Sequence, residues 1–331
     1  MSSVGIIANP ASGKDIRRLV AHASVFGNNE KINILQRVLL ALDSLGVEQV
    51  SIMPDSFGLG LRALDGLKLT NVQSAILDMP LSATEKDSTN AASLFCEMNV
   101  GCLVVLGGDG TNRAVAKGCG GVPIVSISTG TNNVFPTMVE GTIAGMAAGL
   151  ISTGAVDANE VTYRAKRLEV YFGCDMVDIA LVDVVTSSDF WVGSRAIWDP
   201  TQIREVVLAR AEPGSIGISS IGTCFQPLDS RDERGLYLAL GPGGTRVLVP
   251  FAPGLVARVA VREFKLLSKD ESVALDGKAA TVALDGERQI EIFGQKTIIV
   301  RLTNNGPRVV DIPRCMDIAA RSGVFQKLGR F

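Results

Sequence analysis

The 331-residue chain is poor in histidine, in aromatic residues and in excess charge of either sign. Its one histidine, His22, rules out zinc sites built from several histidines and leaves a Ser-His-Asp triad only that residue. Aromatic residues make up 5% of the chain, which disfavours a stacking platform for single-stranded nucleic acid. The net charge is −2, from 32 basic and 34 acidic side chains, so the sequence lacks the basic excess of a nucleic-acid-binding protein.

Long apolar runs and closely paired cysteines are also missing. No stretch of 18 apolar residues occurs, so no membrane-spanning helix is expected, and no basic amphipathic helix indicates a membrane surface. The six cysteines show no C-x-x-C spacing, which disfavours a metal or redox site. The first residues are typical of a strand and turn and not of a secretory signal. We therefore expect a cytoplasmic protein with reduced cysteines and with neither nucleic acid nor a membrane as its partner.

Apolar residues and glycine are abundant. Hydrophobic residues make up 47% of the chain and glycine fills 35 positions, and at this length we expect about two domains with a large core. In the first part, apolar runs alternate with helical patterns, which predicts a doubly wound α/β domain over 1–155 with a mostly parallel sheet. The predicted strands are 4–8, 47–53, 72–79, 102–106 and 122–127, and the predicted helices are 15–23, 32–45, 84–98 and 137–151.

The pattern changes after residue 155. Short runs of strand character fill 156–302 and are separated by Gly, Pro and Asp-Gly, which predicts an antiparallel, sandwich-like β-rich domain. One helix is expected at 200–211, with Arg204 and Arg210 on its solvated face, and a last helix at 313–322. The other predicted strands include 167–172, 177–186, 215–221, 236–240, 246–250 and 256–262.

The strongest chemical signal is the stretch Gly-Gly-Asp-Gly-Thr at 107–111, which directly follows an apolar strand. We call it the second loop, because another polar loop precedes it in the sequence. Glycines let the backbone approach a ligand closely, and the amides at the start of the following helix favour a phosphate. The acid in the loop, Asp109, can hold Mg²⁺ or accept a proton from an attacking hydroxyl. The alternative is a tight turn in which Asp109 only caps the helix.

Two more polar loops follow predicted strands. The first loop, residues 9–14, offers amides, a hydroxyl and a lysine, and the third loop, residues 130–133, reads Gly-Thr-Asn-Asn. Each alone is ordinary turn chemistry. Because ligands bind at the carboxyl ends of parallel strands, three such loops at one edge of a sheet predict a nucleotide site.

The three loops resemble those of the superfamily of NAD kinases and diacylglycerol kinases, and the whole pattern resembles the ATP-NAD kinase-like acetoin catabolism protein X family. The stretches 214–219 and 284–287 extend the resemblance. It implies an ATP-dependent kinase with Mg²⁺, in which Asp109 accepts the proton of the acceptor hydroxyl. It assigns no residue to the metal, and it assigns nucleotide and phosphate binding to Asn9, Ser12, Gly13, Lys14, Gly107, Gly108, Gly110, Thr111, Gly130, Thr131, Asn132 and Asn133.

The acceptor side departs from the NAD kinase pattern. The acceptor-binding candidates are Asp183, Gly214, Ser215 and Asp285. The Asn-acid pair with which NAD kinases bind the dinucleotide reads Val182-Asp183, and their tyrosine is replaced by Ile218. A site that binds a polar substrate through hydrogen bonds loses much of its affinity when those partners are replaced. NAD is the first candidate acceptor, and another small hydroxylated metabolite of carbon or acetoin catabolism is the alternative.

Two further alternatives are less favoured: a lipid acceptor, and a nucleotide-binding sensor without turnover. The resemblance also implies a homodimer or homotetramer formed through the β-rich domain. It further implies that the tail, residues 303–331, packs back on the first domain.

Overall fold

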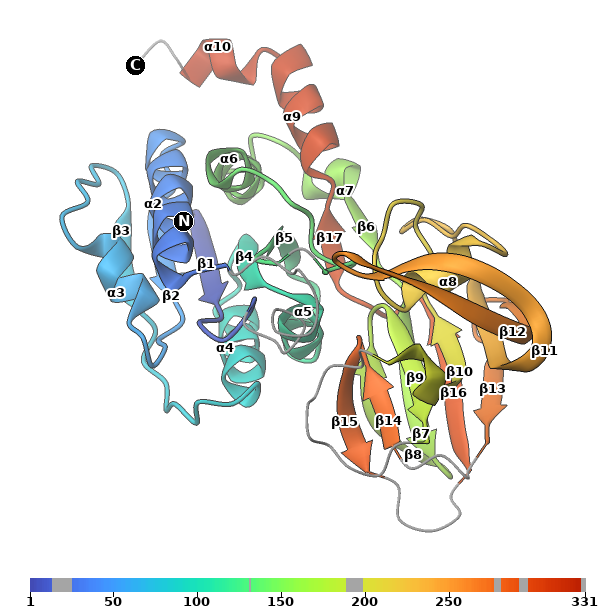
Figure 1. Ribbon diagram of the computed structural model, residues 1–331. Helices are drawn as coiled ribbons and strands as arrows, with labels where there is room; N and C mark the ends of the chain where they lie inside the picture. Colours follow the sequence, from blue (N-terminus) through green and yellow to red (C-terminus); the bar gives the residue numbers. More distant parts are fainter. Residues whose placement is uncertain (14–25, 131, 189–198, 277–280, 292–296, 329–331) are drawn as a thin grey trace.

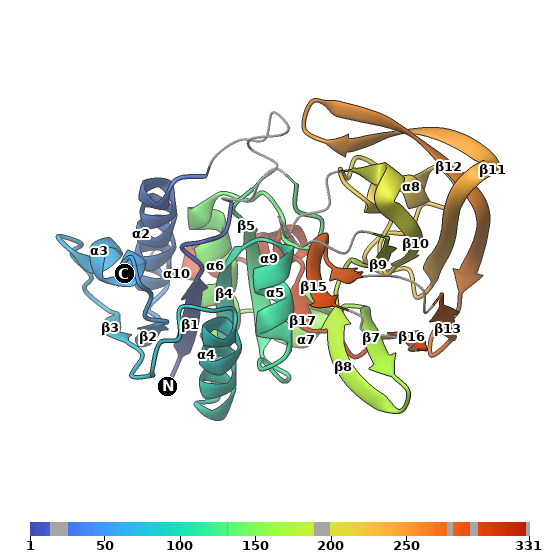
Figure 2. The same ribbon diagram turned by 60° about the horizontal axis from the view of Figure 1, so that its bottom comes forward.

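The computed structural model describes residues 1–13, 26–130, 132–188, 199–276, 281–291 and 297–328. An α/β part and a β-rich part lie side by side (Figures 1 and 2). The α/β part contains a seven-stranded sheet in the order β3-β2-β1-β4-β5-β17-β6, parallel except for β6. Its strands are β1 (Ser3–Ala8), β2 (Gln49–Ile52), β3 (Gln73–Ile76), β4 (Cys102–Gly107), β5 (Pro123–Ser128), β6 (Thr162–Arg164) and β17 (Arg308–Val310).

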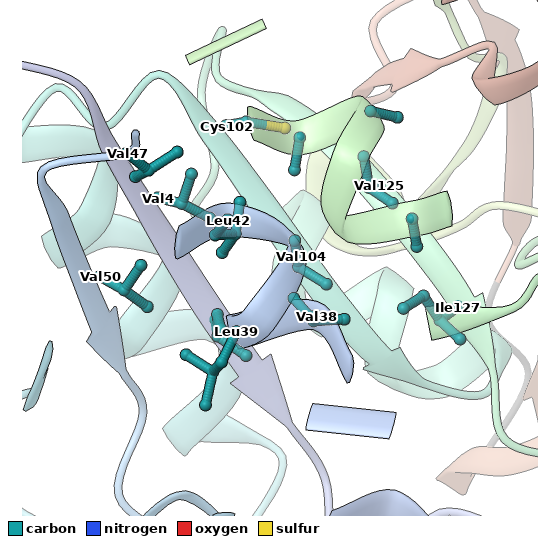
Figure 3. Packing of buried hydrophobic residues seen from close by; sticks show 14 of the residues in the cluster. Val4, Val38, Leu39, Leu42, Val47, Val50, Cys102, Val104, Val125 and Ile127 are labelled. Atoms are coloured by element: carbon teal, nitrogen blue, oxygen red, sulfur yellow. The ribbon is translucent and has the colours of Figure 1, made fainter. Parts of the chain in front are cut away.

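Helices cover both faces of this sheet, which explains why β4 and β5 are buried along their whole length. On one face, α2 (Asn28–Ser44) and α6 (Gly141–Ser152) share an apolar cluster with Val104 of β4. Figure 3 shows Val38 and Leu42 of α2 in this cluster. On the other face, α4 (Lys86–Glu97) and α5 (Asp109–Ala116) pack with Leu103 of the same strand. Neighbouring residues of β4 therefore serve opposite faces.

The predicted helices of this part are largely present. The helix expected at 32–45 is α2, and the one expected at 137–151 is α6, which begins four residues later. Its start is set by Glu140, whose carboxylate accepts the N–H of Thr142 at 2.7 Å. Two short helices, α3 (Leu59–Leu64) and α7 (Ala158–Val161), complete the part. The helix expected at 15–23 lies outside the described residues.

The β-rich part is a sandwich of two antiparallel sheets, ordered β12-β11-β10-β9-β14-β15 and β13-β16-β7-β8. One apolar cluster fills the space between them, with Val170 and Val300 from the smaller sheet and Val207 and Val282 from the larger. The predicted fold class is confirmed. The strands are β7 (Arg167–Phe172), β8 (Asp175–Ala180), β9 (Asp183–Ser187), β10 (Ile203–Leu208), β11 (Gly235–Ala252), β12 (Leu255–Leu267), β13 (Ser272–Leu275), β14 (Thr281–Leu284), β15 (Glu287–Glu291) and β16 (Ile298–Thr303).

The predictions for 200–211 and for 215–221 are wrong. Residues 200–211 form a single 3-10 turn (Pro200–Gln202) and strand β10, because Val206 and Val207 are β-branched and β10 is paired on both edges. Arg204 is exposed as expected, but Arg210 is buried. The strand expected at 215–221 is replaced by the short helix α8 (Ser219–Thr223).

The end of the chain returns to the α/β part. Strand β17 pairs with β5 on one side and with β6 on the other. Helix α9 (Ile312–Arg321) then packs on α6, where Cys315 is fully buried, and α10 (Val324–Leu328) follows. The chain therefore runs between the two parts twice, after β6 and again before β17 (Figure 1).

Candidate active site

The three loops follow β1, β4 and β5, which are neighbours in the sheet and run in parallel. Nδ2 of Asn9 donates a hydrogen bond to Oγ1 of Thr111 at 2.9 Å, which joins the first loop to the second. The hydroxyls of Ser12 and Thr129 are 2.8 Å apart, which joins the first loop to the residue just before the third. Residues from three separate strand ends thus form one polar surface at the carboxyl edge of the sheet.

Asp109 is the first residue of α5 and is half-buried. Its Oδ1 accepts the backbone N–H of Phe135 at 2.7 Å, and both of its carboxylate oxygens lie 3.1 Å from the N–H of Val134. These described bonds run to the segment after the third loop and not along helix α5. The carboxylate is therefore held in one orientation by two amides from the neighbouring strand's loop.

The glycines of the second loop have different surroundings. A Cβ on Gly107 would lie 2.4 Å from the Thr111 side chain, and one on Gly108 would lie 2.8 Å from Oδ1 of Asn133. The closest atom to a Cβ on Gly110 is a Glu287 carboxylate oxygen at 3.6 Å, an ordinary contact. Packing against Thr111 therefore requires Gly107, a Cβ on Gly108 would displace the end of the Asn133 side chain, and a Cβ on Gly110 would make only ordinary contacts.

The β-rich part contributes a turn at Asp285 and Gly286, called the Asp-Gly turn, between β14 and β15. Both residues have positive φ, +53° and +73°. Oδ1 of Asp285 accepts the N–H groups of Leu181 and Val182 at 2.9 and 2.8 Å. Oδ1 of Asp183 accepts the N–H of Gly286 at 3.0 Å. These hydrogen bonds therefore hold Asp183 and Asp285 close together, although they are far apart in the sequence.

Asp285 is buried beside a cation. Burial raises the pKa of its carboxyl to about 6, against the opposing effects of Arg113 and of the backbone N–H groups that it accepts. Nε of Arg113 lies 3.9 Å from Oδ2 of Asp285, and its Nη2 bonds Glu85 at 3.2 Å. The Asp-Gly turn is therefore tied electrostatically to helix α5, which lies near β15 in Figure 2.

A cleft lies where the two parts meet, with an empty volume of about 340 Å³ that includes space open to solvent. Its polar lining includes Asp109, Asn132, Asp183, Ser219 and Asp285. Its apolar lining includes Val134, Ile216, Ile218 and Phe251. The cleft thus brings residues assigned to the nucleotide together with residues assigned to the acceptor.

Not every candidate residue reaches this cleft. Gly214 and Ser215 are not among the described residues that line it, but the Ser215 hydroxyl lies 3.2 Å from that of Ser219, which does. In the third loop, Nδ2 of Asn133 bonds the Ser128 hydroxyl at 2.8 Å and the carbonyl of Gly130 at 3.3 Å, which shapes the loop. Lys14, His22 and Thr131 lie outside the described residues.

Arg210, the residue expected in solvent, contacts this site through Phe135. Its guanidinium lies 4.5 Å from the centroid of the Phe135 ring, and its Nη1 lies 3.6 Å from Glu212. Its Nε and Nη2 are buried without a hydrogen-bond partner among the described residues. The backbone amide of Phe135 binds Asp109 at 2.7 Å, so Arg210 packs on the side chain of a residue that orients this acid.

Comparison with known proteins identifies the family. Residues 4–155 match the family described as ATP-NAD kinase N-terminal domain, and residues 166–305 match the family described as acetoin catabolism protein X C-terminal domain. The chain is 38% identical over 340 residues to "Acetoin catabolism protein X" of Cupriavidus necator, covering 98% of this chain and 94% of that protein. The chain belongs to the acetoin catabolism protein X family.

Solved structures with a similar arrangement also exist. Two structures of a proposed diacylglycerol kinase from Bacillus anthracis str. Sterne are 13% identical to this chain, with TM-scores of 0.43 and 0.42. They cover 93% of this chain, which in turn covers 97% and 98% of theirs. In this member of the acetoin catabolism protein X family, no helix among the described residues is long and apolar enough to cross a membrane.

Sequence reasoning missed three charged residues near the cleft. Lys31 is fully buried under the first loop, Arg113 is fully buried beside Asp285, and Glu287 lies against Gly110. Two of them carried a signal. Lys31 lies four residues before Leu35, on the apolar stripe of α2 that continues to Val38, and Glu287 belongs to the stretch 284–287 that extends the family resemblance. The places of Arg113 and Glu287 depend on contacts with residues far along the chain, which no local pattern reveals.

Proposed function

We propose that the protein is a kinase that transfers the γ-phosphoryl group of ATP to a hydroxyl of a small molecule. The observation that carries this proposal is the cleft itself, where Asp109 and Asn132 of the nucleotide side line the same space as Asp183 and Asp285. A phosphoryl donor and a hydroxyl acceptor must meet in such a space, and positioning supplies most of the catalysis in phosphoryl transfer.

In the proposed reaction the acceptor hydroxyl attacks the γ-phosphorus, the bond from that phosphorus to the bridging oxygen breaks, and ADP leaves. The hydroxyl proton passes to the carboxylate of Asp109, which the N–H groups of Val134 and Phe135 hold in place. The phosphates lie against the first and second loops, where the amides at the start of α5 stabilise negative charge. Asp109 suffices as the base, because this reaction needs positioning more than strong basicity.

Mg²⁺ suits the oxygen atoms available here. No group of three or more His, Cys, Asp or Glu side chains within the described ranges could hold a metal alone. Mg²⁺ is commonly held by one or two protein oxygens together with substrate phosphates. Oδ1 of Asn132, which is buried without a hydrogen-bond partner among the described residues, would supply such an oxygen on the cleft wall, next to the carboxylate that accepts the proton. Bound with ATP, the ion neutralises phosphate charge.

We propose NAD as the first acceptor to test, because residues 4–155 match the ATP-NAD kinase domain and Asp183 is retained in the cleft. The second candidate is another small hydroxylated metabolite. The apolar wall formed by Ile218 and Phe251 favours it. The name of the relative from Cupriavidus necator places that protein in acetoin catabolism, and the panel therefore includes hydroxylated metabolites of carbon catabolism.

The test measures ADP formation from Mg-ATP by the purified full chain, with NAD and in parallel with a panel of small hydroxylated metabolites. NADP formation at about 1–10³ s⁻¹ supports NAD, and ADP release with another compound keeps the kinase and changes its acceptor. Asp109→Asn is expected to lower kcat by about 10²–10⁴-fold and to keep ATP affinity. ATP binding without turnover for any compound would contradict the proposal and indicate a nucleotide sensor.

The matched control for this variant is Asp43→Asn. Asp43 is more buried than Asp109, and its carboxylate likewise accepts backbone N–H groups, those of Thr70, Asn71 and Val72 at 2.7–2.9 Å, but it does not line the cleft. Asp43→Asn should therefore keep kcat while losing stability. Equal loss of kcat in both variants would mean that Asp109 acts only through folding.

We also propose a cytoplasmic homodimer or homotetramer, as the family resemblance implies. Sedimentation velocity of the purified full chain tests the oligomeric state. A monomer at assay concentrations would contradict it.

A further inference from the structure

Lys31 is a charged residue on the buried, apolar face of helix α2. It lies in the first turn of α2, and its exposed fraction is 0%. The same face of the helix continues with Leu35, Val38 and Leu42, which are all fully buried in the core. Lysine is almost never fully buried unless it is paired, because removing an ammonium group from water is unfavourable without hydrogen-bond acceptors.

The acceptors are the backbone of the first loop. Nζ of Lys31 donates to the carbonyl of Asn9 at 2.8 Å, to that of Ser12 at 2.8 Å and to that of Pro10 at 3.1 Å. A side-chain oxygen of Asn28 lies at 3.3 Å. The loop is thus wrapped around one ammonium group, and each carbonyl bond is a charge-assisted one.

This wrapping decides which atoms the loop presents to a ligand. Carbonyl oxygens that turn towards Lys31 do not face a phosphate. In a planar trans peptide the C=O and the following N–H point in opposite directions, so the carbonyl of Ser12 directs the N–H of Gly13 away from Lys31. Gly13 accommodates this turn with a φ of +71°, and a Cβ there would lie 2.4 Å from the carbonyl oxygen of Thr129.

Two of the residues whose carbonyls Lys31 binds also contact residues in or next to the other loops. Asn9, whose carbonyl is held by Lys31, donates from its side chain to Thr111 in the second loop. Ser12, also held by its carbonyl, places its hydroxyl 2.8 Å from that of Thr129. A shift of the first loop would therefore disturb the relative placement of all three.

We propose that Lys31 is a positioning residue for the part of the site that binds ATP. By binding the carbonyls of the first loop, its ammonium group orients the backbone of residues 9–13 for binding the phosphates of ATP. This proposal rests on the proposed kinase function. It assigns Lys31 a role in ATP affinity that is separate from its contribution to the core, and that separation can be measured.

The experiment compares three full-length proteins: the wild type, Lys31→Met and Leu39→Ala. Lys31→Met keeps a side chain of similar length and removes the ammonium group. Leu39→Ala removes apolar volume from the buried face of the same helix, within the core cluster. For each protein, calorimetry gives the Kd of Mg-ATP and thermal unfolding gives Tm. Kinetics with the acceptor that the panel identifies give KM for ATP and kcat.

We expect Lys31→Met to raise both Kd and KM for ATP roughly 10- to 100-fold, the size of a lost set of hydrogen bonds to a charged group, with a smaller change in kcat at saturating ATP. Leu39→Ala should lower Tm and leave the Kd of Mg-ATP unchanged. If Lys31→Met is not folded by circular dichroism, Lys31→Gln is measured in its place, because it keeps donor protons and removes the charge.

The outcomes separate the two proposals. A wild type that binds ATP together with a folded Lys31 variant of unchanged Kd overturns the role of Lys31 and leaves the kinase in place. An equal loss of affinity in Leu39→Ala also overturns it, because the effect would then follow from stability alone. A wild type that binds no Mg-ATP overturns the proposed function and, with it, this inference.

Discussion

Nε of Arg113 lies 3.9 Å from Oδ2 of Asp285, and neither side chain is exposed to solvent. The contact joins helix α5, which begins at Asp109, to the Asp-Gly turn of the β-rich part. Because Oδ2 of Asp285 and Nε of Arg113 have no hydrogen-bond partner among the described residues, the ion pair compensates burial only in part. The raised pKa of Asp285 follows from that mismatch.

Asp285→Asn should change how stability depends on pH. Burial raises the pKa of Asp285 from 3.8 to about 6, so the folded state keeps the proton longer than the unfolded state does. In the wild type, Asp285 contributes about 3 kcal/mol to the free energy of unfolding below pH 3.8, and this contribution is lost as pH rises through about 6. The free energy of unfolding, measured by denaturant titration of both proteins across this range, should show that fall only in the wild type.

Asp43 supplies the control, because its shift has the opposite sign. Burial alone would raise the pKa of Asp43, but hydrogen bonds from Asn71, Val72 and Thr70 bring the pKa below its usual value. Its contribution is present above the unfolded pKa and is lost as pH falls, so Asp43→Asn should remove a rise of stability with pH. The same slope difference in both variants would contradict the assignment for Asp285.

Gly110→Ala separates ligand binding from folding. A Cβ at this position meets only a Glu287 oxygen at 3.6 Å, so the variant should fold with a Tm close to that of the wild type. In the proposed complex the phosphates lie at the start of α5, where the added methyl group would intrude, and we expect kcat/KM for ATP to fall about 100-fold. Gly121→Ala, where nothing lies within 4 Å of the Cβ, should leave both quantities unchanged. Normal ATP kinetics in Gly110→Ala would place the phosphates elsewhere.

Arg210→Met tests whether the β-rich part helps to orient Asp109. The guanidinium packs 4.5 Å from the Phe135 ring centroid in a buried place, where such a contact is worth about 2 kcal/mol. We expect a loss of stability of that order, and a lower kcat with an unchanged KM for ATP, because the amide of Phe135 then holds Asp109 less firmly. Arg204→Met, at an exposed position on β10, is the control. A variant that loses stability and keeps kcat would limit Arg210 to packing.

Five of the seven strands in the sheet of the α/β part, β1 to β5, could be predicted because they carry local signals, whereas β6 and β17 are not among the predicted strands. Each residue of β4 and β5 is buried, and a continuous apolar run ended by glycine or polar residues identifies such a strand. The three loops could also be predicted to converge, since parallel neighbouring strands end at one edge. Both signals are contained within a few residues of the chain.

The β-rich part was harder to predict because distant contacts decide it. The run 177–186 reads as one strand, but it is broken between β8 and β9 where Leu181 and Val182 donate to Asp285, more than 100 residues away. In the stretch at 214–219, the serine that lines the cleft is Ser219, at the start of α8, and not Ser215. Neither the break nor the turn of that short helix has a local pattern.

The place of β17 in the sheet has a consequence for how this protein is made. Residues 308–310 lie between β5 and β6, so the sheet that begins at Ser3 is completed only by a strand near the end of the chain. On the ribosome, β5 gains its outer neighbour only after the β-rich part has been synthesised. Contacts this far apart in sequence slow folding and leave an unpaired edge exposed in the nascent chain. Synthesis and folding of the two parts are therefore coupled, and a fragment that stops at residue 155 lacks one edge of its own sheet.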